Sequence, residues 1–287
     1  MPLSANYAFN PTTKKSAAHR LLRSSDGDTL LVEQPIRLVS CDTPEKAPYA
    51  GAPAVSQPKL DRCRQRLENG FYNALPADLR NYLIERLTQD AAERHISAAV
   101  DASAHFEDLT GRRLTLPSGN QRRVAVLPSG EIIDTYGRML AYIAPWYNGP
   151  PNDPIPPVGS PDRHTFNLNM IADGWAAFFP IYPSLPKIQD MRLAVTAAEE
   201  AWDQKLGAWE FYGENLLLGY EYRMCIKLAA APNADKGISD AFQRVCVDLR
   251  TLKIVGKFGF PAVPPSLRLW VWEADVPEAR TELALVD

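Results

Sequence analysis

Acidic and arginine side chains gather in three short blocks whose residue types suit the cleavage of a phosphodiester bond. The blocks are residues 26–29 (Asp-Gly-Asp-Thr), residues 37–45 and residues 134–138 (Asp-Thr-Tyr-Gly-Arg). Taken singly, each has the composition of an ordinary turn, loop or helix start. Together they supply carboxylates for a metal ion and a water molecule, and guanidinium groups for a phosphate.

A divalent cation is the first group that these blocks could hold. Asp28 and Asp42 carry hard oxygen donors at two predicted strand ends, and the carbonyl of Thr43 could add a third. Hard oxygen ligands select calcium or magnesium rather than zinc, and calcium takes about 6–8 of them. We therefore predict calcium as the cofactor, with magnesium or manganese as alternatives.

The other charged residues suit the phosphate and the attacking water. Arg37 and Arg138 present guanidinium groups that can bind two phosphate oxygens at once and stabilise the charge that builds in the transition state. Glu45 could take a proton from the water or orient it. A flat strand at about 3.3 Å per residue would place Arg37 and Asp42 about 16 Å apart, on opposite faces. The strand must therefore curl or end before Asp42.

In this order and spacing, the blocks resemble the staphylococcal nuclease (thermonuclease) family. The match comprises the Asp-Gly-Asp-Thr turn, an arginine five residues before Asp-Thr-Pro-Glu, and Asp-x-Tyr-Gly-Arg-x-Leu-Ala-Tyr-Ile at 134–143. The resemblance implies an α+β fold with an OB-fold-like, five-stranded β-barrel, and calcium-dependent hydrolysis of DNA and RNA with little sequence specificity. It also implies individual roles: calcium ligation by Asp28, Asp42 and Thr43, action on water by Glu45, and phosphate stabilisation by Arg37 and Arg138.

Further residues are candidates for contact with the nucleic acid. The resemblance points to Tyr136 and Tyr182. Two arginine doublets flank a predicted insertion near the third block and could contact the phosphate backbone, although solvated surface charge is the alternative for each. These doublets are Arg112 with Arg113, and Arg122 with Arg123.

Hydrophobic periodicity indicates the elements that would position these residues. Residues 29–32 and 36–41 predict a β-hairpin, and residues 124–127 and 138–143 predict two strands joined by a turn at 128–130. Helices are predicted over 76–100, 166–172 and 191–209. Loops are predicted over 47–58 and over 145–161, because the latter holds seven prolines in 17 residues.

The chain divides into three predicted regions. Residues 1–21 form a polar, flexible leader, and residues 22–213 form the nuclease-like domain with insertions. Residues 214–287 form a strand-rich α/β extension of unknown role, with strand-like runs at 216–228, 245–255 and 267–272 and a turn at 233–237. We expect this extension to restrain or target the activity, or to mediate self-association or contact with a protein partner.

Composition limits the remaining possibilities. The 31 basic and 34 acidic residues give a net charge of −3, so no global positive field indicates a nucleic-acid partner. The four cysteines lack the spacing of a zinc site. The sequence shows no apolar run that would span a membrane and no secretory signal, which predicts a cytoplasmic protein. The rival to a nuclease is a catalytically silent OB-fold module that binds nucleic acid or a protein partner.

Overall fold

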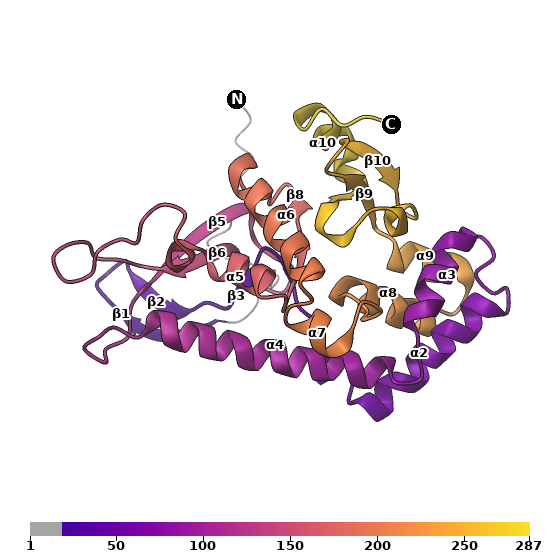
Figure 1. Ribbon diagram of the computed structural model, residues 1–287, viewed down its shortest axis with the longest axis horizontal. Helices are drawn as coiled ribbons and strands as arrows, with labels where there is room; N and C mark the ends of the chain where they lie inside the picture. Colours follow the sequence, from indigo (N-terminus) through magenta and orange to yellow (C-terminus); the bar gives the residue numbers. More distant parts are fainter. Residues whose placement is uncertain (1–18) are drawn as a thin grey trace.

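The structure, a computed structural model, describes residues 19–287 and has an α+β fold with several small sheets (Figure 1). Most of the predicted leader falls on residues 1–18, outside the described residues. The sheets of residues 19–287 contain two, three or four strands and form no closed barrel. The α+β class is therefore confirmed, whereas the OB-fold barrel is not. None of the helices in this range is long and apolar enough to cross a membrane.

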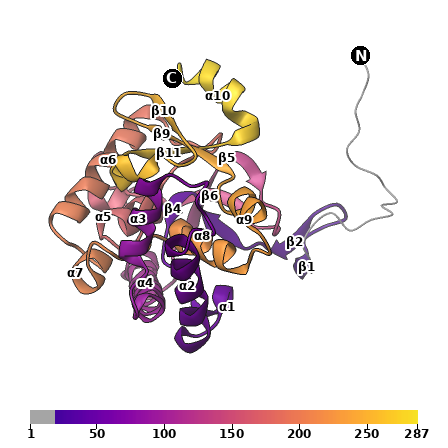
Figure 2. The ribbon, with the colours of Figure 1, turned by 90° about the vertical axis from the view of Figure 1, so that its right-hand side faces the viewer.

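Strand pairing near the first block differs from the prediction. Strands β1 (Arg20–Ser24) and β2 (Leu30–Glu33) form an antiparallel hairpin, which projects from the body of the molecule in Figure 2. Strand β3 (Ile36–Leu38) pairs in parallel with β6 (Met139–Pro145) instead. The predicted hairpin between 29–32 and 36–41 is wrong, because the Pro35 carbonyl accepts from Met139 N–H and draws β3 toward a distant partner.

The third block forms the turn between β5 (Val124–Ile133) and β6. The carboxylate of Asp134 accepts hydrogen bonds from the backbone N–H groups of Tyr136 (2.9 Å) and Arg138 (3.0 Å), and Gly137 takes a φ of +78°. The predicted turn at 128–130 is wrong, since those residues lie within β5 where the strand register shifts. The turn therefore falls at the block that carries Arg138.

Helices fill the region between the second and third blocks. They are α1 (Ala47–Ala50), α2 (Pro53–Glu68), α3 (Ala77–Arg86) and α4 (Ala91–Leu114). The predicted loop at 47–58 is wrong because Pro53 stands at the first helical position, where its missing N–H costs nothing, and Pro58 is accommodated inside α2. The predicted helix at 76–100 is two helices that break at Leu87. In Figure 1, α4 runs along the long axis of the molecule.

The middle of the chain follows the prediction more closely. The segment after β6 is irregular as far as the short 3-10 helix η1 (Pro161–Arg163), as its prolines require. Helix α5 (Phe166–Ala172) forms as predicted. The predicted helix at 191–209 divides into α6 (Ile188–Asp203) and α7 (Ala208–Tyr212), which are separated by Gly207 at a φ of +53°. Strands β7 (Ala177–Phe179) and β8 (Ile181–Tyr182) precede α6.

The last quarter of the chain contains both helices and strands. Residues 216–228, predicted as a strand, lie mainly in helix α8 (Gly219–Ala230), and the predicted turn at 233–237 is the start of α9 (Ala234–Ala241). The strand prediction failed because buried residues lie on most sides of α8, which weakens the helical period of its sequence. The turn prediction failed because Asn233 caps α9 by accepting from the Lys236 N–H at 2.9 Å. The remaining elements are β9 (Arg244–Asp248), β10 (Lys253–Gly256), η2 (Phe260–Ala262), η3 (Pro265–Leu267), β11 (Arg268–Trp272), η4 (Glu273–Asp275) and α10 (Val276–Glu282).

Residues 214–287 share their core and their sheets with the preceding chain. The largest hydrophobic cluster joins Leu60 and Cys63 of α2 to Tyr220 and Leu228 of α8. Strand β11 pairs in parallel with β8. Strand β4 (Ser40–Asp42) pairs antiparallel with β7, which places the second block next to this core. The C-terminal residues therefore help to build the surroundings of the candidate site.

Candidate functional site

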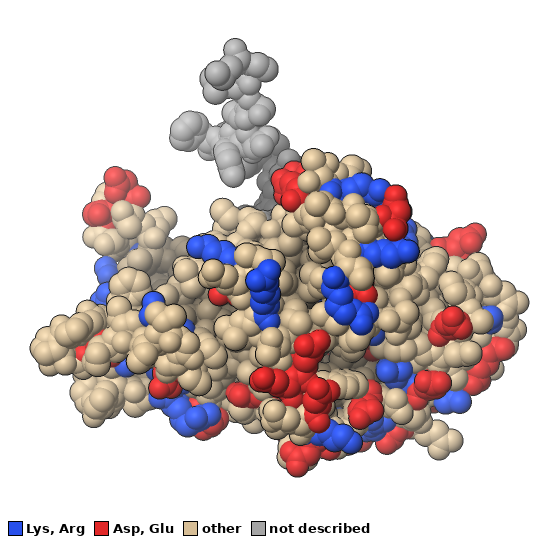
Figure 3. All heavy atoms as spheres, turned by 45° about the horizontal axis from the view of Figure 1, so that its top comes forward, with Lys and Arg blue, Asp and Glu red and all other residues tan. Residues whose placement is uncertain are grey.

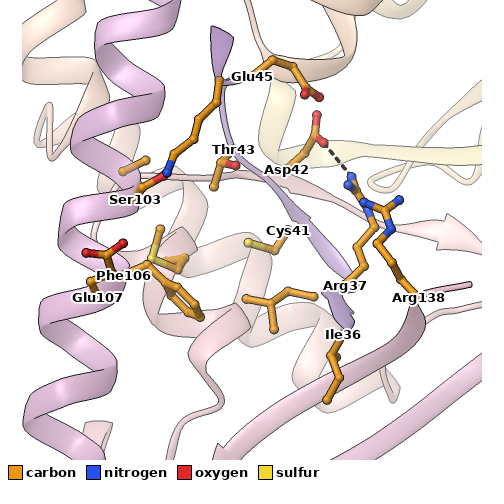
Figure 4. A pocket seen from close by; sticks show the side chains of 14 residues that line it. Ile36, Arg37, Cys41, Asp42, Thr43, Glu45, Ser103, Phe106, Glu107 and Arg138 are labelled. Atoms are coloured by element: carbon orange, nitrogen blue, oxygen red, sulfur yellow. Dashed lines mark hydrogen bonds and ion pairs between the residues drawn. The ribbon is translucent and has the colours of Figure 1, made fainter. Parts of the chain in front are cut away.

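Five of the six residues implied by the resemblance line one cavity. The cavity has a volume of about 400 Å³ and opens between the β3–β4 segment, helix α4 and the end of the β5–β6 turn. Figure 4 shows the side chains of Arg37 and Arg138 lying beside each other, with Asp42 and Glu45 above them. The residues that converge are Arg37, Asp42, Thr43, Glu45 and Arg138.

A break in the strand brings Arg37 and Asp42 together. Ser40 has a φ of +58°, which interrupts the extended chain between β3 and β4, and its hydroxyl lies 2.9 Å from the Tyr142 hydroxyl. Arg37 can then donate to Asp42 Oδ1 from Nη2 at 3.1 Å (Figure 4). The expectation that the strand must end before Asp42 is thus confirmed.

Arg138 is held by the turn that precedes it. Its guanidinium donates to Asp134 Oδ2, at 2.8 Å from Nε and 2.7 Å from Nη2, and lies 5.3 Å from the centre of the Tyr136 ring. Burial raises the pKa of the Asp134 carboxyl, but hydrogen bonds from Arg138 and Tyr136 bring it below its ordinary value. The pair with Asp134 fixes the guanidinium at the cavity, where it is still about one-third exposed.

Glu45 is positioned through its backbone by His95 of α4. The Glu45 N–H donates to His95 Nε2 at 2.8 Å, and His95 Nδ1 lies 3.0 Å from the Leu217 carbonyl. The histidine is fully buried, stacks on Tyr222 with 3.9 Å between ring centroids, and has a pKa lowered to about 3 by burial. A neutral ring that donates from Nδ1 and accepts at Nε2 satisfies both contacts.

Arg223 of α8 makes the closest contacts to the acidic residues of the site. Its Nη2 lies 3.0 Å from both Asp42 Oδ1 and Asp42 Oδ2, and its Nη1 donates to Glu45 Oε1. Burial alone would lower the pKa of this guanidinium, but the carboxylates of Asp42 and Glu45 raise it above its ordinary value. The sequence offered one signal for this role. Arg223 stands in a mostly apolar run, and an arginine that is buried with such a run must be paired with an acid.

Arg244 of β9 adds a further cation beside the pair. Its guanidinium lies 4.9 Å from the ring centroids of Phe179 and Trp272. Among the described residues it has no carboxylate partner within ion-pair distance. Burial lowers the pKa of Arg244 to about 10, and the nearby charge of Arg223 adds to this effect.

The donor atoms predicted for calcium do not form a calcium site. Asp28 lies exposed in the β1–β2 turn, where Thr29 bonds its carboxylate, and it does not line the cavity. The Asp42 side chain is 1% exposed and its two oxygens are bound by arginines. A Cβ built on Gly219 would meet the Thr43 carbonyl oxygen at 2.5 Å. Within residues 19–287, no group of three acidic, histidine or cysteine side chains is arranged to hold a metal.

The predicted nucleic-acid contacts are scattered over the molecule. Tyr136 is 75% exposed next to the cavity, whereas Tyr182 is buried and donates to Glu282 Oε2 at 2.7 Å. The four arginines lie outside the cavity lining: Arg112 pairs with Asp108, Arg113 donates to the His164 carbonyl, Arg122 binds both oxygens of Asp153 at 2.6 Å, and Arg123 is exposed. Only Tyr136 lies near the converging residues.

Neither a family model nor a curated protein matches this chain. The resemblance to the staphylococcal nuclease family therefore rests on the three sequence blocks, and the site must be interpreted from its own geometry.

Proposed function

We propose that this chain is a nuclease-like phosphodiesterase that acts on DNA and RNA with little sequence preference. The observation that carries the proposal is the convergence of Arg37, Arg138, Asp42 and Glu45 on one cavity from segments about 100 residues apart in the sequence. Two arginines beside a carboxylate are the groups that phosphodiester hydrolysis requires. A nuclease-like core around β3, β5 and β6, related to the OB-fold barrel, is part of this proposal.

In this mechanism, Arg37 and Arg138 bind the oxygens of the scissile phosphate. Guanidinium groups can bind two phosphate oxygens at once, and this contact strengthens as negative charge accumulates on phosphorus. Glu45 orients a water molecule and accepts its proton as the water oxygen bonds to phosphorus. By the resemblance, the bond from phosphorus to the 5′ oxygen breaks, the departing 5′ oxygen takes up a proton from the solvent, and a 3′-phosphate remains.

Only the resemblance to the nuclease family supports the prediction that activity depends on calcium. The arrangement of Asp28, Asp42 and Thr43 does not fit the ion, so the steps above use only residues of the chain. Digestion assays with calcium, magnesium, manganese or a chelator measure this dependence directly.

The proposal is tested by digestion of plasmid DNA and of single-stranded RNA with the R37A/E45A double variant. Removal of one preorganised charged donor costs about 10²–10³ in turnover, so the double variant should lose at least that much. Arg62, which is exposed on α2, offers a matched control, and R62A should digest at the wild-type rate. Equal digestion by wild type and R37A/E45A would refute the assignment.

A second candidate function is a nucleic-acid-binding module without turnover. The pairing of Arg223 with both Asp42 and Glu45 favours it, because this pairing occupies both oxygens of Asp42 and one of the two oxygens of Glu45. Such a module would retard a labelled oligonucleotide in a gel and leave it intact. Self-association or partner binding through 214–287 and a cytoplasmic location also stay predictions.

A further inference from the structure

Asp42 and Glu45 of the cavity already share a cation, which is the guanidinium of Arg223. We propose that Arg223 occupies the place of a divalent cation, so that the cavity binds a phosphodiester or phosphate group without a metal. The identity of the ligand rests on the proposed function, whereas the replacement of the cation by Arg223 does not depend on it.

The contacts of Arg223 resemble those of a bridging ion. One terminal nitrogen lies between the two oxygens of Asp42, and the other binds Glu45. Arg37 takes a further position on Asp42 Oδ1. The Asp42 side chain is almost completely buried, so a hydrated ion has no exposed oxygen of this residue to approach.

Helix α8 holds Arg223 in this position. The neighbouring Glu221 is completely buried and accepts hydrogen bonds from Tyr82 (2.6 Å) and Arg268 (3.1 Å). Its other oxygen accepts from the Leu218 N–H at 3.1 Å, at the start of the helix. At Gly219, an added Cβ would lie 2.6 Å from Asp42 Oδ2, so the helix start lies directly against the carboxylate. Because α8 belongs to the main core, Arg223 is a fixed part of the site.

The charge around the cavity also suits an anion. The cations in or beside it are Arg37, Lys46, Arg138, Arg223 and Arg244, and the acids are Asp42, Glu45, Glu107 and Asp134. Five positive and four negative groups leave a formal charge of +1. Arg223 and Arg37 together balance the charges of Asp42 and Glu45, and the exposed portions of Arg37 and Arg138 can contact a phosphate that the net positive charge attracts.

Calcium titration of the melting temperature tests the replacement without relying on catalysis. Wild type, R223Q and R223K are compared in 10 mM calcium and in chelator. R223Q leaves Asp42 and Glu45 without their shared cation, so calcium should raise its melting temperature by about 3–5 °C, as expected for a site of about millimolar affinity. Wild type and R223K, which keep a positive charge there, should shift by less than about 1 °C.

Two results would overturn the proposal: a shift of wild type as large as that of R223Q, or no shift in R223Q. If R223Q fails to fold, calorimetric titration of wild type with calcium tests the proposal instead, because any binding at submillimolar affinity contradicts the replacement of the ion by Arg223.

Binding of a labelled 5′-phosphorylated oligonucleotide is the second experiment. Its affinity for wild type should agree within about twofold in calcium and in chelator. Loss of oligonucleotide binding in chelator would contradict a metal-free site. If the oligonucleotide binds in neither solution but calcium still raises the melting temperature of R223Q, only the proposed function is refuted.

Discussion

At the scale of single residues, burial keeps the His95 ring neutral, and the neutral ring positions the backbone of Glu45. The His95 ring stacks on Tyr222 of α8, accepts a hydrogen bond at Nε2 and donates one from Nδ1. Protonation would place a positive charge in the core and would remove the acceptor that holds Glu45 N–H. Its contact with Glu45 joins residues 50 positions apart, so local signals in the sequence could not predict it.

The buried histidine predicts a specific loss of stability in acid. Its pKa is about 3 in the folded protein against about 6.5 when unfolded, so only the unfolded chain gains a proton between these values. The free energy of unfolding contributed by this group is therefore complete above pH 6.5 and falls as the pH is lowered. From pH 7.5 to 5.5 the loss should be about 1.4 kcal/mol.

Urea unfolding of wild type and H95Q at both pH values measures this contribution. Glutamine cannot gain a proton, so H95Q should be less stable than wild type at pH 7.5 and should lose about 1.4 kcal/mol less on acidification. An identical pH dependence for the two proteins would contradict the assignment of a neutral, buried His95.

At the scale of elements, helix α8 connects the candidate site to a buried ion pair. Arg268 of β11 donates to Glu221 at 3.1 Å, to the Tyr220 hydroxyl at 2.5 Å and, through Nε, to the Val263 carbonyl at 2.7 Å. The side chains of Arg268 and Glu221 are 2% and 0% exposed. Removing one partner of such a pair leaves the other charge buried and uncompensated.

R268M should therefore lower the free energy of unfolding by about 3–5 kcal/mol. Methionine keeps most of the side-chain length, so lost charge rather than lost volume accounts for the change. R62A, at an exposed position of α2, should change stability by less than about 0.5 kcal/mol. A loss of stability in R268M no larger than that in R62A would show that the buried pair does not hold α8.

The elements also show which predictions a sequence can support. Helix α5 and strand β11 were predicted at nearly their observed bounds, because local signals at Gly174 and at the apolar run of β11 define them. Strand β3 could not be paired correctly, since its partner β6 lies about 100 residues further on. The resemblance implied the convergence of Arg37 with Arg138, whereas Arg223 could not be placed because nothing local connects α8 to Asp42.

At the scale of the whole molecule, the chain from 214 onward is part of the main core rather than an appendage. Leu217, Tyr220 and Cys225 are almost completely buried in the cluster that also contains residues of α2 and α3. On the face in Figure 3, acidic and basic side chains are interspersed, in keeping with the small net charge. Local charge at the cavity, rather than a global field, must therefore attract a phosphate.

Truncation after residue 213 should destroy the fold. The shortened chain would expose the apolar surface of α2 that α8 covers, and it would lose the cation between Asp42 and Glu45. Circular dichroism should show no cooperative thermal transition for residues 1–213. A cooperative transition near that of the full chain would contradict a shared core.

The most direct test of the central claim is the rate at which E45Q cleaves a fluorescent oligonucleotide, compared with wild type under single-turnover conditions. Glutamine keeps the size of Glu45 but cannot accept the proton of the attacking water. Cleavage by E45Q should be slower by about 10²–10⁴-fold, with oligonucleotide affinity unchanged within a few-fold. Cleavage by E45Q at the wild-type rate would contradict a phosphodiesterase centred on this cavity.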